Sequence, residues 1–221
     1  MSSTVNFYNH NAASFFADTV AVEMSELHAR FLSHVPLGGL ILDAGCGSGR
    51  DSKAFFTLGY RVSAFDASPA LAQLASDLIG QSVAIRTFDQ VDEIACYDGI
   101  WACASLLHLP PAALPESMGR LWTSLKPGGV FYLSFKLGDG ERENNGRHFT
   151  DATEARLREW TTALADVGSL ECWITQDQRP DHTENWLNAL IHRSTRVPSK
   201  LITGGRDHPF LPQLCESIAH R

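Results

Sequence analysis

The sequence predicts an α/β protein built on a doubly wound, mostly parallel sheet with helices on both faces. Short apolar runs alternate with amphipathic segments, glycine or proline marks most of the junctions, and the first apolar run ends in a glycine-rich turn. Two parallel strands need a crossover between them, and that crossover is usually a helix that packs back on the sheet. The alternation therefore favours one sheet wrapped on both faces.

The opening segment is expected to be one long helix that covers the sheet or the site. Apolar residues recur every three or four positions from Phe16 through Met24 and Phe31 to Val35, directly before Pro36. This spacing places them on one helical face, and a proline commonly ends such a pattern.

Strands and helices then follow in turn. Leu40, Ile41 and Leu42 are too few for a helix and predict a buried strand. The later strands are expected at residues 61–66, 83–89, 97–104 and 130–135, and the helices at 50–58, 68–80 and 114–125. Ser68 and Pro69 are typical of a helix start, and Gly59 and Gly80 of helix ends. Ligands of such sheets bind beyond the carboxyl ends of the strands, so residues directly after the strands are the candidates for chemistry.

The C-terminal half continues with less regular signals. Residues 138–146 are polar and glycine-rich, which predicts a mobile loop over the sheet edge. Asp151 is expected to cap a helix, with Glu154 three residues on and an apolar stripe from Leu157 to Val167. Residues 170–175 and 186–191 are expected to form a closing strand pair, and the composition changes from Ser194.

Composition restricts the class of protein. The chain has 221 residues, of which 44% are hydrophobic, and this suits one compact domain. A net charge of −7 argues against an extended electrostatic interface with the phosphate backbone of a nucleic acid. The cysteines are five and include no CxxC pair, so we expect neither a disulfide framework nor a thiolate zinc site. Without a leader-like or membrane-spanning apolar run, or a metal-ligand spacing such as HExxH, we expect a cytoplasmic protein without metal.

The glycine turn after the first strand carries the main functional signal. Gly45, Gly47 and Gly49 alternate after Asp43, whereas a phosphate-binding P-loop requires a lysine and a hydroxyl residue where this chain has Arg50. The dinucleotide fingerprint spaces its third glycine one residue further on, and Asp43 would repel a pyrophosphate. An acid at that position can instead accept hydrogen bonds from an ammonium group.

S-adenosylmethionine meets these demands, because it carries no phosphate, an aminoacyl group and a ribose diol. Asp66 ends the second strand, where a carboxylate can accept hydrogen bonds from both ribose hydroxyls. Asp89 ends the third strand and is placed to accept from the adenine amine, with Phe88 or Phe65 as an apolar wall. The order glycines, acid and acid at three successive strand ends makes the signal specific.

With these residues the chain resembles the class I S-adenosylmethionine-dependent methyltransferases over about residues 7–193. The matching segments are Leu42-Asp43-Ala44-Gly45-Cys46-Gly47-Ser48-Gly49, Ala64-Phe65-Asp66, Thr87-Phe88-Asp89, Tyr97-Asp98-Gly99-Ile100-Trp101 and Leu125-Lys126-Pro127-Gly128-Gly129. It looks most similar to small bacterial enzymes of the tellurite-resistance type, which carry Gly-Arg-Asp or Gly-Arg-Asn after the turn. The resemblance implies a seven-stranded sheet whose last strand is antiparallel, and it implies that Tyr8 and Phe16 lie over the cofactor.

The residues expected to hold the cofactor come from the opening segment and from the strand ends. They are Tyr8, Asp43, Gly45, Cys46, Gly47, Gly49, Arg50, Asp66, Ala67, Phe88, Asp89 and Ala104. Cys46 is interpreted as a small side chain that the turn tolerates. Two interpretations of Arg50 remain open, a contact with the cofactor carboxylate and an ion pair with Asp51.

His108, after the fourth strand, is the candidate catalytic residue. An imidazole there can take a proton near neutral pH, and the alternative is a histidine hydrogen-bonded to the turn at Pro110 and Pro111. Trp101 is interpreted as a core residue. Cys103 is interpreted as a buried small residue, because no basic neighbour in sequence would activate its thiol.

Basic residues after the fifth and sixth strands lie where an acceptor would enter. Lys136, Arg147 and Arg179 are the candidate substrate residues, and Arg142 lies in the same region. Arginine binds carboxylates through paired hydrogen bonds, although exposed charges are more often simply solvated.

The function these observations favour is S-adenosylmethionine-dependent methyl transfer to a small-molecule acceptor. Ala104-Ser105-Leu106-Leu107 stands where methyltransferases of nucleic-acid bases carry Asn-Pro-Pro-Tyr or Asp-Pro-Pro-Tyr, which disfavours a nucleic-acid partner. The alternative is a catalytically silent domain that binds the cofactor or scaffolds a partner within a larger fusion, and a nicotinamide enzyme is third. Residues 1–36 are expected to form a helical lid segment and 37–193 the cofactor-binding domain, while 194–221 form a tail that weakly resembles the opening of phospholipase-D-like domains.

Overall fold

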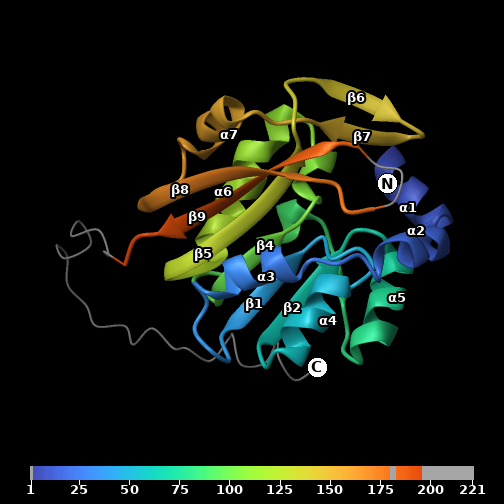
Figure 1. Ribbon diagram of the computed structural model, residues 1–221, viewed down its shortest axis with the longest axis horizontal. Coiled ribbons are helices and arrows are strands. Elements are labelled where there is room, and N and C mark those ends of the chain that lie inside the picture. Colours follow the sequence, from blue (N-terminus) through green and yellow to red (C-terminus); the bar gives the residue numbers. More distant parts are fainter. Residues whose placement is uncertain (1, 180–182, 196–221) are drawn as a thin grey trace.

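A computed structural model describes residues 2–179 and 183–195 and has a seven-stranded sheet at its centre (Figure 1). The strand order is β3-β2-β1-β4-β5-β9-β8. The strands are β1 Leu40–Ala44, β2 Arg61–Asp66, β3 Ala84–Ile85, β4 Tyr97–Ala102, β5 Leu125–Lys136, β8 Val167–Gln176 and β9 Asn185–Arg193. Strands β1 to β5 pair in parallel, and β9 lies antiparallel between β5 and β8. The predicted fold class is therefore confirmed, including the antiparallel last strand.

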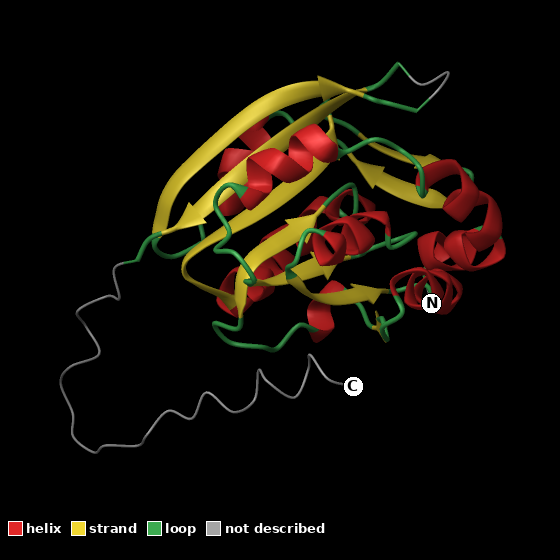
Figure 2. Ribbon diagram, turned by 60° about the horizontal axis from the view of Figure 1, so that its bottom comes forward, coloured by secondary structure: helices red, strands yellow, loops and turns green. Residues whose placement is uncertain are grey.

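Helices cover both faces of this sheet (Figure 2). The α-helices are α1 Ser3–His10, α2 Ala12–Thr19, α3 Ser25–Leu32, α4 Arg50–Thr57, α5 Pro69–Ile79, α6 Leu114–Ser124 and α7 Glu154–Thr161. Short 3-10 turns occur at η1 Phe88–Gln90, η2 Leu106–His108 and η3 Pro111–Ala113. Two buried apolar clusters correspond to the two faces, one with α3, α4 and α5 and the other with α6 and α7. Every residue of β1 is buried between them, as its apolar run predicted.

The opening segment differs from the predicted single helix. It forms three helices, α1, α2 and α3, and the chain changes direction between Thr19 and Ser25. Met24 is the N-cap of α3, and the Glu23 carboxylate before it accepts a hydrogen bond from the Ser25 backbone N–H at 2.6 Å. The apolar spacing continues across the break because each short helix has its own buried side, so periodicity alone could not reveal the interruption.

Residues 138–146, predicted as a mobile loop over the sheet edge, do not form an irregular loop, because residues 141–146 form the first strand and the turn of a β-hairpin. Strand β6 Glu141–Asn144 pairs antiparallel with β7 Arg147–Thr150 through the turn at Asn145 and Gly146. Both turn residues have positive φ, 52° and 78°, as a type I′ hairpin turn requires. The Asn-Gly dipeptide was the signal that could have predicted this hairpin.

The start and the end of α7 differ from the prediction, and β5, β8 and β9 are longer than predicted. Thr153, and not Asp151, caps α7 by accepting from the Arg156 N–H at 3.3 Å, while Asp151 forms an ion pair with Arg142. Val167 begins β8 and does not belong to the apolar stripe of α7.

The third strand is shorter than expected. Strand β3 has only two residues, and the chain then enters the 3-10 turn η1. The side chain of Thr87 and that of Gln90 cap this turn reciprocally, which draws the segment away from an extended conformation.

None of the helices between residues 2 and 179 or 183 and 195 has the length and apolar character needed to cross a bilayer. Most of the predicted tail, from residue 196 on, lies outside the described residues, so the boundary at 194 stays a prediction.

Candidate cofactor and acceptor site

A cavity of about 790 Å³ lies at the carboxyl ends of β1, β2 and β4. Its walls come from the glycine turn, from α1 and α2, and from the β6–β7 hairpin. Every predicted site residue lines this cavity with the exception of Gly49. The fold therefore gathers residues from position 8 to position 179 around one space.

The three glycines of the turn have positive φ but serve two different purposes. A Cβ atom at Gly45 would lie 2.6 Å from the Ser105 Cβ, and one at Gly47 would lie 3.2 Å from the Phe15 ring. At Gly49 the clash would be with Ala75 of α5, at 2.9 Å. Gly45 and Gly47 thus let Ser105 and Phe15 approach the turn at the cavity wall, while Gly49 lets the turn pack closely against α5.

Asp66 joins the end of β2 to the glycine turn. Its two carboxylate oxygens accept hydrogen bonds from the backbone N–H groups of Gly47 and Ser68, both at 2.8 Å. Burial raises the pKa of this carboxyl, and the backbone donors oppose that effect. An ionised carboxylate has about four acceptor positions, so lone pairs remain for hydroxyl groups of a ligand.

The neighbouring strand end supplies an aromatic wall and a second acid. Phe88 and Phe65 contact edge to face, with ring centroids 5.5 Å apart, and both line the cavity. Asp89 is exposed to solvent and accepts a hydrogen bond from the Thr87 hydroxyl. Ala67 lies on the cavity wall directly after Asp66.

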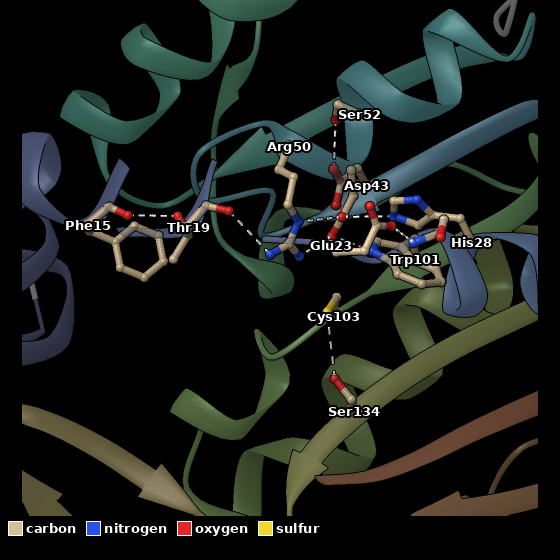
Figure 3. Close-up of polar contacts among 12 residues, drawn as sticks. Phe15, Thr19, Glu23, His28, Asp43, Arg50, Ser52, Trp101, Cys103 and Ser134 are labelled. Atoms are coloured by element: carbon tan, nitrogen blue, oxygen red, sulfur yellow. Dashed lines mark hydrogen bonds and ion pairs between the residues drawn. The ribbon is translucent and has the colours of Figure 1, made fainter. Parts of the chain in front are cut away.

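A cluster of charged residues is buried beneath the glycine turn (Figure 3). Asp51 accepts from Arg50 through two hydrogen bonds of 2.8 and 2.9 Å, and its other contacts are His28 and the Trp101 indole N–H, each at 2.9 Å. Burial acts to raise the pKa of Asp51, but Arg50 and His28 outweigh it and hold the pKa below its ordinary range. Trp101 is fully buried and stacks on Tyr132 at 3.8 Å, as expected of a core residue.

Arg50 therefore makes the contact with Asp51 that was one of its two open interpretations. Its remaining terminal nitrogen lies 3.5 Å from the Thr19 carbonyl oxygen at the end of α2, so the arginine also fastens the lid segment to the turn. A contact with the cofactor carboxylate stays a prediction for this residue, which lines the cavity.

Asp43 and the two cysteines nearby are held in their neutral forms by burial. The Ser52 hydroxyl donates to Asp43 at 2.6 Å, and burial together with the adjacent Asp51 raises the pKa of Asp43 (Figure 3). Burial also raises the pKa of the Cys46 thiol well above its usual range and that of Cys103 to about 12. Neither thiol is an activated nucleophile.

The lid segment places Tyr8 and Phe15 on the cavity, not Tyr8 and Phe16. The Phe15 and Tyr8 rings contact edge to face with centroids 5.0 Å apart, and both line the cavity, whereas Phe16 does not. The position of Phe16 that the resemblance implied was wrong, because α2, which begins at Ala12, turns Phe15 and not Phe16 to the cavity.

His108 lies between the lid segment and the β6–β7 hairpin. Its Nε2 is 2.8 Å from the Tyr8 hydroxyl oxygen, and its Nδ1 is 2.8 Å from the His148 carbonyl oxygen. Neither partner belongs to the turn at Pro110 and Pro111, which was the alternative to the catalytic role. Burial lowers the pKa of His108 to about 4, so the imidazole is neutral at physiological pH.

The three candidate substrate cations differ in their pairing. Lys136 forms an ion pair with Glu184, and Arg179 binds Asp177 through two hydrogen bonds of 3.0 and 2.6 Å. Arg147 has no carboxylate partner among the described residues, and its guanidinium carbon lies 4.4 Å from the centre of the Phe7 ring.

Two residues that shape the cavity were not predicted. Ser105 donates to the Ala44 carbonyl oxygen at 2.7 Å and packs against Gly45, and Phe15 covers Gly47. The position of Ser105 directly after the fourth strand could have identified it as a cavity residue. For Phe15, the local sequence pattern did not show that this residue, and not its neighbour Phe16, would face the cavity. The Ser134 hydroxyl accepts from the Ala104 N–H at 2.9 Å and fixes that predicted site residue at a positive φ of 50°.

No group of three or more His, Cys, Asp or Glu residues in the described parts of the chain has the arrangement of a metal site.

A glycine turn after β1, acids after β2 and β3, and a cavity above them on a sheet of this order define the class of protein. A family model described as a methyltransferase domain matches residues 41–129, which contain all three strand ends. Residues 41–129 thus match a methyltransferase domain, and the sheet order and fold are those of class I S-adenosylmethionine-dependent methyltransferases. The tellurite-resistance type remains a prediction within that class.

Known proteins similar to this chain agree with that class. A solved structure of the 1,6-didemethyltoxoflavin-N1-methyltransferase of Burkholderia thailandensis, with bound 1,6-didemethyltoxoflavin and S-adenosylhomocysteine, has 25% identity and a TM-score of 0.68, covering 86% of this chain and 85% of its own. A malonyl-[acyl-carrier protein] O-methyltransferase of Serratia marcescens is 30% identical over 52% of this chain and 48% of its own length. A ubiquinone biosynthesis O-methyltransferase of Methylocella silvestris is 35% identical over 45% and 41%. The chain thus spans less than half the length of these two curated relatives.

Proposed function

We propose that this protein binds S-adenosylmethionine and transfers its methyl group to a small-molecule acceptor in the same cavity. The observation that carries the proposal is the arrangement of the strand ends, where a bare glycine turn, Asp66 and the Phe88–Asp89 pair face one space of about 790 Å³. That volume is in the range of small-molecule sites and exceeds what a nucleoside alone requires.

The cofactor fits the residues that are present. Gly45 and Gly47 line the cavity where an aminoacyl group would lie against the turn, and a Cβ at either would collide with Ser105 or Phe15 on the same wall. Asp66 retains acceptor positions for the ribose hydroxyls, and Phe88 with Asp89 offers a ring wall and an acceptor for the adenine. When bound, S-adenosylmethionine supplies a methyl group on a positively charged sulfur that departs as a neutral thioether.

The protein's own contribution is alignment and the exclusion of water. The lid residues Tyr8 and Phe15 cover the turn and separate it from solvent, and fixed positioning of this kind can lower a barrier by about 7 kcal/mol or more. His108 Nε2 accepts from Tyr8, so a proton from an acceptor hydroxyl would reach it through the phenol, but its pKa of about 4 makes it a weaker base than the unperturbed imidazole expected from the sequence. The relay leaves a positive charge on the imidazole and none on Tyr8.

The test separates binding from turnover. Calorimetry should show binding of S-adenosylmethionine and S-adenosylhomocysteine by the wild-type chain, and incubation with a metabolite extract should release S-adenosylhomocysteine above an extract-free control. Tight binding without turnover in any extract would favour the silent scaffold, and tighter binding of NAD would restore the nicotinamide enzyme. No uptake of S-adenosylmethionine in equilibrium dialysis would overturn the proposal.

A bacterial source, a cytoplasmic location and the lack of a nucleic-acid or membrane partner remain predictions from composition and from the motifs. The net charge of −7 and the missing Asn-Pro-Pro-Tyr sequence after β4 support the prediction that nucleic acid is not a partner.

A further inference from the structure

One of the described cations that line the cavity makes no ion pair with a described carboxylate. Five arginine and lysine side chains of the described residues line the cavity, and four of them pair with carboxylates. These pairs are Arg50–Asp51, Arg86–Glu93, Lys136–Glu184 and Arg179–Asp177. Arg147 alone has no acidic partner in the described part of the chain, and its buried Nε has no hydrogen-bond partner there. A buried donor left unpaired costs free energy, so an acceptor atom supplied from outside would be favoured.

The setting of Arg147 orients its guanidinium group. The residue begins strand β7, and its guanidinium carbon lies 4.4 Å from the Phe7 ring centre and 5.1 Å from that of Phe149. Aromatic rings attract the cation but accept little hydrogen bonding from it. The guanidinium also interacts with the Tyr8 hydroxyl, which itself binds His108, and its Nε is the donor that remains without a partner among the described residues.

We infer that the methyl acceptor carries a carboxylate, and that Arg147 is the residue that binds it. This inference rests on the proposed function and names the class of its substrate. A guanidinium group matches a carboxylate through two parallel hydrogen bonds. One unpaired cation balances one negative charge, whereas a phosphate ester with a charge of about −2 would exceed it.

The location of Arg147 also explains how the carboxylate would direct the reacting group. Thr4 of α1 accepts from the His148 N–H at 3.0 Å, so the hairpin that carries Arg147 is tied to the lid helix (Figure 1). A carboxylate bound to Arg147 holds the acceptor beside Tyr8 and His108, with its far end toward the glycine turn.

The experiment uses three probes that share a phenyl ring, of which benzoate and benzamide also share one shape, on the enzyme saturated with S-adenosylhomocysteine. Benzoate, benzamide and phenyl phosphate are titrated by ligand-observed NMR or calorimetry. We expect benzoate to bind at least about tenfold more tightly than benzamide and more tightly than phenyl phosphate. Arg147→Gln should abolish the preference for benzoate, and Arg147→Lys should reduce it because lysine keeps the charge but not the paired geometry.

The control is Arg142→Gln, which removes the same charge from the same hairpin outside the cavity lining and should leave the preference unchanged. Affinity for S-adenosylhomocysteine is measured first for each variant, which shows that the site is folded. If that ligand does not bind the wild-type chain, the proposed function is wrong. If it binds but benzoate shows no binding or no preference, or Arg147→Gln retains the preference, the inference about the carboxylate is overturned and the proposed function stands.

Discussion

The Tyr8 hydroxyl and the His108 Nε2 lie 2.8 Å apart and join the lid segment to the end of β4 across 100 positions of sequence. Because the His148 carbonyl oxygen can only accept, His108 Nδ1 carries the ring proton in the neutral form. Nε2 is then the acceptor, and the Tyr8 hydroxyl donates to it. The base candidate and the lid are thus one hydrogen-bonded unit.

Replacing His108 should distinguish a proton-accepting role from a structural one. His108→Ala should lower the methylation rate by a factor of about 100 if the imidazole accepts a proton. His108→Gln can still hydrogen-bond to Tyr8 but cannot take a proton, so it should be as slow as the alanine variant. Rates are measured as S-adenosylhomocysteine release under single-turnover conditions. A glutamine variant with wild-type rate would leave only the structural role.

The depressed pKa of His108 should also appear in the pH dependence of stability. The folded-state pKa of about 4 is below the ordinary value of about 6.5, so the unfolded chain binds more protons between these two values. The free energy of unfolding should therefore fall as pH drops from about 6.5 to 4, and this residue's contribution should be complete above about pH 6.5. Urea denaturation should show that the wild type loses about 2 kcal/mol more than His108→Gln over this window. Equal losses in the two proteins would assign the effect to other groups.

The features that local sequence could predict are those set by neighbouring residues. The buried run Leu40–Ala44, the helix start at Ser68 and the positions of Asp66 and Asp89 all follow from short-range patterns of burial, capping and strand ends. Parallel strands bring their carboxyl ends to one edge of the sheet. The order of strands and helices therefore predicted which residues would meet at the site.

The features that could not be predicted depend on which distant side chains meet. Asp51 gave no local sign that it would accept from His28 and the Trp101 indole, 23 and 50 residues away in sequence. Likewise, the sequence offered three substrate cations without showing that Lys136 and Arg179 would find acids. Partner choice is decided by tertiary packing, which local periodicity does not encode.

Asp66 should contribute to cofactor affinity through charged hydrogen bonds. Asp66→Ala removes the carboxylate that bridges Gly47 and Ser68 and should weaken S-adenosylmethionine binding by about 1.5 to 3 kcal/mol. Calorimetry measures the change, and Asp77→Ala on the exposed side of α5 is the charge-matched control. Unchanged affinity in the Asp66 variant would remove this residue from the site.

The glycine of the turn that does not line the cavity should matter for stability more than for binding. Gly49→Ala places a methyl group 2.9 Å from the Ala75 Cβ at a φ of +77°, so strain and overpacking add, and the free energy of unfolding should fall by about 3 kcal/mol. Gly59→Ala has a similar φ of +88° but open space around its Cβ, and should cost only about 1 kcal/mol.

The comparison of these two variants by urea denaturation isolates the contact with α5. Adding Ala75→Gly to Gly49→Ala removes the methyl group that the new side chain meets, so the double variant should recover the overpacking part of the loss but not the backbone strain. The loss of stability in the double variant should therefore approach the loss from backbone strain alone, as in Gly59→Ala. A glycine within α5 adds its own cost of about 1 kcal/mol to that loss. If Gly49→Ala and Gly59→Ala are equally destabilised, the close packing of the turn against α5 contributes nothing, and Gly49 is required only for its backbone conformation.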